Sequence, residues 1–396
     1  MQYLFILGST PKLSIAELES FYPSENLKLI TPQVLCITSG TSISEIEIMD
    51  KLGGTVKICE VIKSLSEKKD LDKEISVVLK LMAVKNKIVF GISKYLDFNL
   101  GNIKGFCKNI KYYLEEEQIK SRFVLPLGET LTSVQVSKQK LTEIVLVSAG
   151  NKILLARTLI VQEFEGWSKR DYKRPEADPK SGMLPPKVAR IMLNMVKTDK
   201  SPENPFVVLD PFCGMGTIGA EGLMLGYWVI LSDKYKEVVQ KAEKNLHWLC
   251  KSYNISGENF TVHISDARTI SKLLPRNSLD AIVTEPFLGP PVNYFHGREM
   301  FDNRKITPGR ILAIFNELEE LYLAAFQDWQ NVLKPEAKVA IIFPSFRIGQ
   351  EEYFLKNIID SCEKLGYNVI SGPFAYGHPQ SVLRRNIYIF QNRTRK

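Results

Sequence analysis

A glycine-rich turn between a short apolar run and a helix-like segment constrains this chain more than any other feature of its sequence. Residues 206–209 predict a buried parallel strand, and residues 217–225 have the small residues and apolar spacing of a helix start. Gly214, Gly216 and Gly219 satisfy the G-x-G-x-x-G pattern. Strand, glycine turn and helix form an architecture in which backbone N–H groups face a ligand at the carboxyl end of a sheet.

The residues around the glycines distinguish between two nucleoside ligands. Asp233 follows the next apolar run, residues 227–231, where a dinucleotide-binding protein places an acid that reaches ribose hydroxyls. The dinucleotide pattern opens its turn directly off the strand, whereas here Asp210 and three further residues intervene. A carboxylate at the strand tip repels a pyrophosphate and suits a cation. The turn therefore favours S-adenosylmethionine over a nicotinamide dinucleotide, and glycines that merely pack a helix on a strand are the alternative.

Length and composition indicate the number of domains, the kind of partner and the cellular compartment. A chain of 396 residues predicts two or three domains, and its net charge of +8 permits a polyanionic partner without requiring one. Six scattered cysteines without a C-x-x-C pair predict a reducing cytoplasm, and four scattered histidines argue against a zinc site. No run is long and apolar enough to cross a bilayer, so we expect no membrane anchor and no secretory leader.

The first part of the chain alternates strand and helix signals. Residues 1–67 predict a small α/β sandwich with strands at 2–7, 34–37 and 55–62. A polar joint at residues 68–73 indicates a domain boundary. Beyond it the apolar pattern predicts strands at 78–82, 87–93, 132–136, 144–148 and 153–161.

One amphipathic helix in this second segment carries a lysine stripe. Within residues 102–117, four apolar side chains share one helix face while Lys104, Lys108 and Lys111 share another. Such a stripe is either an ordinary solvated face or a track for nucleic-acid phosphates.

A basic and aromatic bridge leads into the glycine-turn region. Residues 167–175 contain Lys169, Arg170, Lys173 and Arg174 together with a tryptophan and a tyrosine. Charge combined with stacking rings suits an RNA groove, and a charged linker is the alternative interpretation.

Three segments resemble one known family. Residues 210–217, Asp-Pro-Phe-Cys-Gly-Met-Gly-Thr, resemble the first motif of class I methyltransferases that modify amino nitrogens of bases. Residues 1 to about 165 resemble, in element order, the ferredoxin-like plus THUMP pair of several tRNA-modifying enzymes. Residues 170–175 and 182–189 resemble the segment that precedes the core in THUMP-containing tRNA guanine-N2 methyltransferases, where it closes over the cofactor.

The resemblance implies an α/β fold in three parts. These are a ferredoxin-like domain over residues 1–67, a THUMP-like RNA-binding domain over 68–163, and a Rossmann-like class I methyltransferase domain over 164–396. The last domain would contain a seven-stranded, mostly parallel sheet. The implied activity is transfer of a methyl group from S-adenosylmethionine to N2 of guanosine in tRNA, by analogy at nucleotide 10. A small activating subunit is a further partner that the resemblance suggests.

The tip of the fourth core strand is where the chemistry is expected. Residues 279–283 predict that strand, and Glu285, Pro286 and Phe287 follow it. An exocyclic amine is a weak nucleophile, so it needs acceptors for its N–H bonds and a ring that stacks the extruded base. A carboxylate, a main-chain carbonyl and an aromatic side chain meet these needs. Related enzymes usually carry Asp/Asn-Pro-Pro-Tyr/Phe, so this chain has a longer acid and one proline fewer.

Pattern and resemblance together give three sets of candidate residues and no metal ligands. The expected catalytic residues are Glu285, Pro286 and Phe287. The expected cofactor-binding residues are Asp210, Pro211, Cys213, Gly214, Gly216, Thr217, Asp233, Lys234, Asp266, Ala267, Met183 and Pro185. The expected RNA-binding residues are Lys104, Lys108, Lys111, Lys169, Arg170, Lys173, Arg174, Arg298 and Arg384.

Three further functions stay open at this point. A nicotinamide oxidoreductase would use the glycine turn for a dinucleotide. A DNA amino-methyltransferase would share the core but leave the first part without a role. A tRNA-binding protein with a relict core would explain the altered Glu285 motif, and it predicts binding without methyl transfer.

Overall fold

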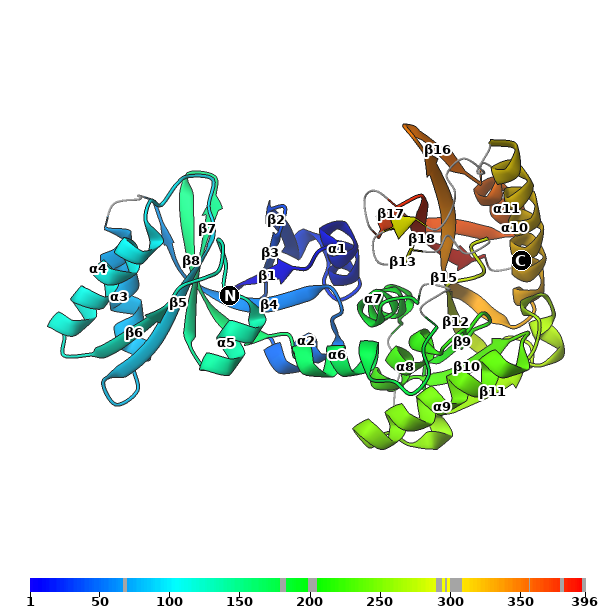
Figure 1. The fold of residues 1–396 in the computed structure, drawn as a ribbon, viewed down its shortest axis with the longest axis horizontal. Helices are drawn as coiled ribbons and strands as arrows, with labels where there is room; N and C mark the ends of the chain where they lie inside the picture. The colour runs from blue at the N-terminus through cyan, green and yellow to red at the C-terminus, as the bar shows by residue number, and fades with distance from the viewer. Residues whose placement is uncertain are drawn as a thin grey trace. The chain divides into compact units, whose positions relative to one another are not determined.

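The computed structural model divides into two compact units, Met1–Gly166 and Trp167–Lys396, each built from helices packed on a sheet (Figure 1). No helix in the described part of the chain is long and apolar enough to cross a membrane. The structure describes residues 1–66, 70–178, 183–198, 205–289, 294–295, 298–299, 308–355, 357–377 and 381–393.

One sheet runs through the whole first unit. Its strand order is β2-β3-β1-β4-β8-β7-β5-β6, so the strands of both predicted N-terminal domains meet where β4 pairs with β8. The proposed division of this unit into ferredoxin-like and THUMP-like domains stays a prediction. The strands are β1 (Gln2–Leu7), β2 (Leu27–Thr31), β3 (Val34–Thr38), β4 (Thr55–Leu65), β5 (Lys87–Tyr95), β6 (Lys120–Val124), β7 (Thr142–Ala149) and β8 (Lys152–Val161), and the helices are α1 (Pro11–Glu19), α2 (Glu45–Lys51), α3 (Leu71–Met82), α4 (Ile103–Glu116) and α5 (Ser133–Gln139).

Two predicted strands of this unit are wrong. Residues 78–82 belong to helix α3, whose buried positions recur at helical spacing from Leu71 to Leu79. Residues 132–136 enter helix α5, because the Thr132 side chain accepts from the backbone N–H of Gln135 and the Gln135 side chain accepts from the backbone N–H of Thr132. This reciprocal capping box starts a helix despite the β-branched residues nearby.

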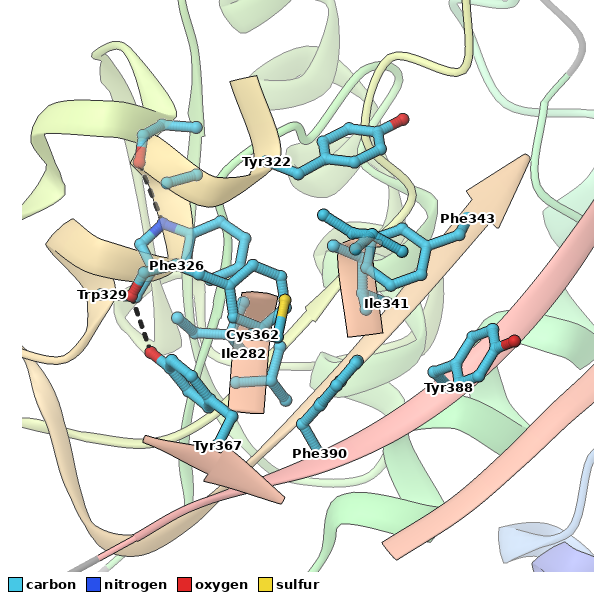
Figure 2. Packing of buried hydrophobic residues seen from close by; sticks show 14 of the residues in the cluster. Ile282, Tyr322, Phe326, Trp329, Ile341, Phe343, Cys362, Tyr367, Tyr388 and Phe390 are labelled. Carbon is cyan, nitrogen blue, oxygen red and sulfur yellow. Dashed lines mark hydrogen bonds between the residues drawn. The ribbon is translucent and has the colours of Figure 1, made fainter. Parts of the chain in front are cut away.

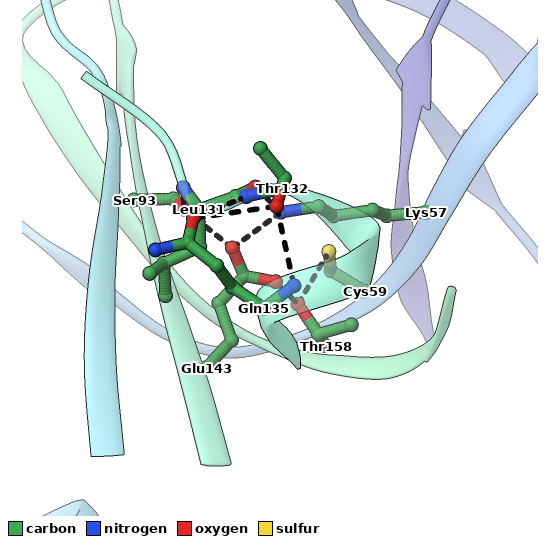
Figure 3. Close-up of polar contacts among 8 residues, drawn as sticks. All are labelled: Lys57, Cys59, Ser93, Leu131, Thr132, Gln135, Glu143 and Thr158. Atoms are coloured by element: carbon green, nitrogen blue, oxygen red, sulfur yellow. Dashed lines mark hydrogen bonds and ion pairs between the residues drawn. The ribbon is translucent and has the colours of Figure 1, made fainter. Parts of the chain in front are cut away.

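A buried polar cluster joins the strands of the first unit (Figure 3). The Nζ of Lys57, on β4, contacts Oε1 of Glu143, on β7, at 2.5 Å and donates to the carbonyl of Leu131 at 2.6 Å. Ser93 and Thr158 donate to the two oxygens of the same carboxylate. Lys57 is only 3% exposed, so its charge is neutralised inside the protein by Glu143.

The second unit contains the predicted mostly parallel sheet. Within the described residues its order is β11-β10-β9-β12-β15-β18-β17, with β16 pairing β15, and β9 to β12 and β15 pair in parallel. β18 pairs antiparallel to both of its neighbours. The strands are β9 (Val207–Asp210), β10 (Trp228–Asp233), β11 (Phe260–Ile264), β12 (Leu279–Thr284), β13 (Tyr294–Phe295), β14 (Arg298–Glu299), β15 (Leu333–Ile348), β16 (Glu351–Phe354), β17 (Tyr367–Tyr376) and β18 (Leu383–Asn392).

Helices cover this sheet and connect its parallel strands. The chain passes from β9 through β10 to β11 on one side, then returns to place β12 on the other side of β9. In such sheets ligands bind beyond the carboxyl ends of the strands at the point where the order reverses. The helices are α6 (Phe164–Tyr172), which begins in the first unit and ends in the second, α7 (Pro186–Val196), α8 (Thr217–Met224), α9 (Lys236–Tyr253), α10 (Pro308–Trp329) and α11 (Ile358–Lys364), with short 3-10 turns at Gly257–Asn259 and Ala267–Lys272.

An aromatic core holds helix α10 against the sheet (Figure 2). The indole Nε1 of Trp329 donates to the carbonyl of Ala267 at 2.9 Å, and the hydroxyl of Tyr367 donates to the carbonyl of Phe326 at 2.8 Å. Both bonds satisfy polar atoms inside an otherwise apolar cluster. The core therefore fixes the turn after β11, which carries Asp266 and Ala267.

Candidate active site

Three carboxylates lie at the carboxyl ends of adjacent parallel strands. Asp210 ends β9, Asp233 ends β10, and Glu285 directly follows β12. Because β9 pairs with both β10 and β12, all three acids belong to one edge of the sheet. The sequence motif correctly predicted a strand, glycine turn and helix here.

Asp210 is the most deeply buried of the three acids. It is 2% exposed, and its Oδ1 accepts from the Thr284 hydroxyl at 2.7 Å and from the Phe212 backbone N–H at 3.2 Å. Burial raises the pKa of Asp210 to about 7, and the nearby charges of Asp233 and Glu285 act in the same direction. A cation at this edge would relieve that cost.

The glycine turn connects these acids to helix α8. Gly214 and Gly216 have φ values of +50° and +79°, which favour glycine. The Gly214 N–H donates to Oδ2 of Asp233 at 3.4 Å. A side chain on Gly219 would meet Leu231 at 2.8 Å, so the third glycine allows α8 to approach the sheet. Thr217 begins α8, and the first-turn amides of a helix have no partners within that helix.

Cys213 and Pro211, both buried, complete the turn. The Cys213 N–H donates to the carbonyl of Ser232 at 2.9 Å. Burial raises the pKa of the Cys213 thiol well above its ordinary value, so it is protonated and unsuited to act as a nucleophile.

The ends of β10 and β11 carry the other predicted cofactor residues. Asp233 is partly buried, which raises its pKa, and its Oδ1 accepts from the Tyr235 N–H at 3.1 Å. Lys234 is exposed, with its Nζ 4.8 Å from the centre of the Tyr235 ring. Both oxygens of Asp266 accept from the guanidinium of Arg268, at 2.9 and 2.7 Å, and this lowers the pKa of Asp266.

Glu285 is held from the antiparallel side of the sheet. Arg385, on β18, donates through Nε to Oε1 of Glu285 at 2.6 Å, and the hydroxyl of Tyr376, on β17, donates to the same oxygen at 3.4 Å. The Glu285 side chain is 15% exposed. Burial raises its pKa, and the charge of Arg385 opposes that rise.

The two residues after Glu285 differ in exposure. Pro286 is buried, whereas Phe287 is 55% exposed, so its ring is accessible to a ligand. The hydroxyl of Tyr322, on α10, donates to the carbonyl of Phe287 at 2.5 Å and fixes the backbone there.

The segment before the core packs beside helix α8. Arg170 and Arg190 donate to the two carboxylate oxygens of Glu221, at 2.7 and 2.6 Å, and all three side chains are buried. Arg174 is also buried and donates to the Thr217 hydroxyl at 2.7 Å. An RNA contact needs an exposed guanidinium, so burial favours a structural role for Arg170 and Arg174 in place of the predicted RNA contact.

The closing segment is only partly described. The Asp178 N–H lies 3.3 Å from Sδ of Met183, and Pro185 precedes the first turn of α7. Gly182, which helped to define the resemblance, lies outside the described residues.

The other predicted RNA contacts are scattered. Lys104 and Lys108 are exposed on α4, whereas Lys111 pairs with Glu115 at 3.4 Å. The remaining four have separate surroundings. Lys169 lies over the rings of Trp248 and Tyr253, Lys173 is exposed, Arg384 approaches Glu352 at 3.6 Å, and Arg298 lies on β14 with a side chain outside the described part.

Several residues of this site were not predicted from sequence. Arg385 and Tyr376 reach Glu285 from strands that are distant in the chain, and Thr284 reaches Asp210. The one available signal was the arginine pair at the start of the last strand. Alternation along a strand sends neighbouring side chains to opposite faces, so strand register decides which arginine faces the site.

The arrangement suits a cationic ligand beside a hydrogen-bond acceptor. Asp210 and Asp233 supply negative charge next to helix α8, and Glu285 supplies an acceptor at the neighbouring strand end. Among the described residues no group of three or more acidic, histidine or cysteine side chains could hold a metal ion.

Comparison with known proteins agrees with this geometry. The profile of the RMKL-like methyltransferase domain family matches residues 173–290. The tRNA (guanine(10)-N2)-dimethyltransferase of Pyrococcus abyssi is 24% identical over 99% of this chain and 100% of its own length. A protein named probable tRNA (guanine(10)-N2)-dimethyltransferase, from Methanothermococcus thermolithotrophicus, is 32% identical over 34% of this chain and 72% of its own.

A solved structure supports the fold over the full length. TrmN from Thermus thermophilus aligns with 99% of this chain and 100% of its own at a TM-score of 0.55 and 14% identity. The chain therefore belongs to the family of class I S-adenosylmethionine-dependent tRNA guanine-N2 methyltransferases.

Proposed function

We propose that this protein transfers a methyl group from S-adenosylmethionine to the exocyclic N2 of a guanosine in tRNA, at nucleotide 10. The observation that carries the proposal is the Glu285 carboxylate, held at the end of β12 beside Asp210. The names of the relatives that match the chain support both the substrate and the position.

The cofactor fits the edge of the sheet by charge. When bound, S-adenosylmethionine supplies an electrophilic methyl group on a positively charged sulfonium. Asp210 offers buried negative charge to the cationic groups, and Asp233 is placed to accept from ribose hydroxyls. The first-turn amides of α8 suit the carboxylate of the methionine part. We assign the adenine amine to Asp266, whose pairing with Arg268 keeps it ionised.

Glu285 then acts on the target amine. Its carboxylate accepts a hydrogen bond from an N–H of the guanine N2 and stabilises the positive charge that develops as the bond from nitrogen to the methyl group forms and the bond from that methyl group to sulfur breaks. Sulfur leaves as a neutral thioether, and the carboxylate takes the proton that nitrogen loses. The Pro286 carbonyl is the second acceptor, and the exposed Phe287 ring stacks on the extruded base. Because a monomethylated amine keeps one N–H, a carboxylate acceptor serves a second transfer as well as the first.

We place tRNA recognition on the first unit, with the exposed Lys104 and Lys108 as phosphate contacts. A small activating subunit stays a prediction from the family resemblance, and stimulation by a cell extract would reveal it. Six unpaired, buried cysteines support a cytoplasmic protein.

Transfer of labelled methyl groups tests the proposal. Purified protein is incubated with labelled S-adenosylmethionine and either unmodified tRNA or duplex DNA. We expect label in tRNA alone. Label in DNA would support a DNA amino-methyltransferase, and tRNA binding without any label would support the relict binding protein.

A further inference from the structure

The contacts of Glu285 extend the proposed function to residues far away in the sequence. Both contacts that described residues make with its carboxylate fall on Oε1, from Nε of Arg385 and from the hydroxyl of Tyr376. No described residue makes a hydrogen bond or ion pair with Oε2. We propose that Arg385 is a positioning residue that anchors Glu285 through Oε1, with Tyr376 as its auxiliary, so that Oε2 accepts the target amine. This inference rests on the proposed function.

The two residues that hold Glu285 also lie next to each other. Tyr376 and Arg385 are paired partners in the antiparallel β17–β18 ladder, and the Arg385 guanidinium lies 5.9 Å from the centre of the Tyr376 ring. The Arg385 side chain is 21% exposed, so the ion pair is largely removed from water. A charged hydrogen bond in such surroundings is both strong and directional.

The anchor explains how a longer acid can work in this position. Glutamate has one more rotatable bond than the aspartate or asparagine usual at this motif, so its carboxylate has more positions to occupy. Fixing Oε1 from β18 removes that freedom and defines where Oε2 lies. The added methylene of Glu285 and the reach of Arg385 are therefore matched features of this chain.

Arg385 also keeps the acceptor charged. The groups that face Glu285 are Arg385 from β18, Tyr376 from β17, Asp210 from β9 and Tyr322 from α10. Of these, Arg385 is the cation. Burial raises the pKa of Glu285 and the Arg385 charge lowers it, so loss of that charge should shift protonation of Glu285 to higher pH.

Kinetics of the full-length protein test the anchor. We expect Arg385→Gln to lower kcat for tRNA methylation about a hundredfold, the scale for a misplaced reacting group, with unchanged affinity for tRNA and S-adenosylmethionine. The rise of kcat with pH should also move to higher pH. Arg385→Lys, which keeps the charge, should regain part of the rate. Arg393→Gln is the matched control, because Arg393 bonds Asn368 and lies just beyond the same strand.

A double variant separates positioning from RNA contact. If Arg385 acts through Glu285, adding Arg385→Gln to Glu285→Gln should cause no further loss of kcat. Two results would overturn the proposal. One is that Arg385→Gln lowers kcat as much in the Glu285→Gln protein as it does in the parent; the other is that Arg385→Gln weakens tRNA binding and leaves kcat unchanged.

Carboxyl NMR provides a readout that does not need activity. In protein with carbon-13 at the glutamate carboxyl groups, the Glu285 signal is assigned by its absence in Glu285→Gln. We expect a higher pKa of Glu285 in Arg385→Gln than in the parent, and an unchanged pKa would contradict the anchor. If the parent methylates no tRNA, the proposed function fails, yet this titration still decides whether Arg385 holds Glu285.

Discussion

Replacement of Asp210 by asparagine should stabilise the fold and weaken the binding of S-adenosylmethionine. Asp210 is buried with its pKa raised from 3.8 to about 7, so between these values the folded protein binds more protons than the unfolded chain. Stability therefore falls as pH rises across this window. Asparagine has the same shape and can still accept from the Thr284 hydroxyl, but it never ionises.

The size of the effect follows from the shift in pKa. A difference of about three pKa units corresponds to on the order of 4 kcal/mol above pH 7, at about 1.4 kcal/mol per unit. For a unit of this size that free energy raises the melting temperature by on the order of 10 °C. The gain should shrink steadily as pH falls toward 4, where Asp210 is protonated in both states.

Thermal unfolding of parent and Asp210→Asn, without ligand and near pH 8 and pH 5, measures this directly. We expect the variant to have a higher melting temperature than the parent at both pH values, with the larger difference near pH 8. We also expect it to bind S-adenosylmethionine more weakly. Equal or lower melting of the variant near pH 8 would refute the reasoning that Asp210 is an ionised, buried group kept for a cationic ligand.

Three other changes have defined outcomes. Asp233→Ala should weaken binding of S-adenosylmethionine by about 1–3 kcal/mol through loss of a charged hydrogen bond, and unchanged affinity by calorimetry would remove Asp233 from the site. Glu285→Asp should lower single-turnover methylation about a hundredfold, because the shorter side chain withdraws from Arg385. Faster transfer by aspartate would identify a decayed form of the common motif. Lys57→Met should destabilise the first unit by about 3–5 kcal/mol in urea because Glu143 is left buried and unpaired, whereas the double change Lys57→Met with Glu143→Leu should restore most of the loss. A double variant as unstable as the single one would show that the ion pair is not the cause.

The parts predicted well from the sequence depend on local signals. The glycine turn between residues 206 and 225 has a strand before it, positive φ at Gly214 and Gly216, and a helix after it, and each feature can be recognised from a few adjacent residues. The family resemblance implied a mostly parallel sheet in the second unit, and the structure confirms one.

The wrong predictions come from competing local signals. Residues 78–82 contain the β-branched and aliphatic types of a strand, but helical spacing of the buried positions over Leu71–Met82 determines the outcome. Residues 132–136 alternate as a strand would, but the capping box at Thr132 starts a helix there.

The chemistry of the site was harder to predict because it depends on long-range register. The sequence predicts a substrate contact for Arg384 and gives no role to the adjacent Arg385, whereas the structure pairs Arg385 with Glu285, 100 residues away in the sequence. Arg170 carries the charge expected of a surface contact, yet its side chain is buried, where it donates a hydrogen bond to Glu221 on α8. Neither partner can be identified without knowing which elements lie side by side.

The most direct measurement is mass mapping of a tRNA transcript that carries guanosine at nucleotide 10, after incubation with S-adenosylmethionine and either the parent or Glu285→Gln. The parent should add one or two methyl groups to N2 of that guanosine. Glu285→Gln should bind both substrates yet slow the transfer by at least about a hundredfold, the scale for losing one preorganised acceptor. A transcript that the parent leaves unmodified, methylation at another atom, or equal rates for the two proteins would contradict the assignment of Glu285 as the acceptor in a tRNA guanine-N2 methyltransferase.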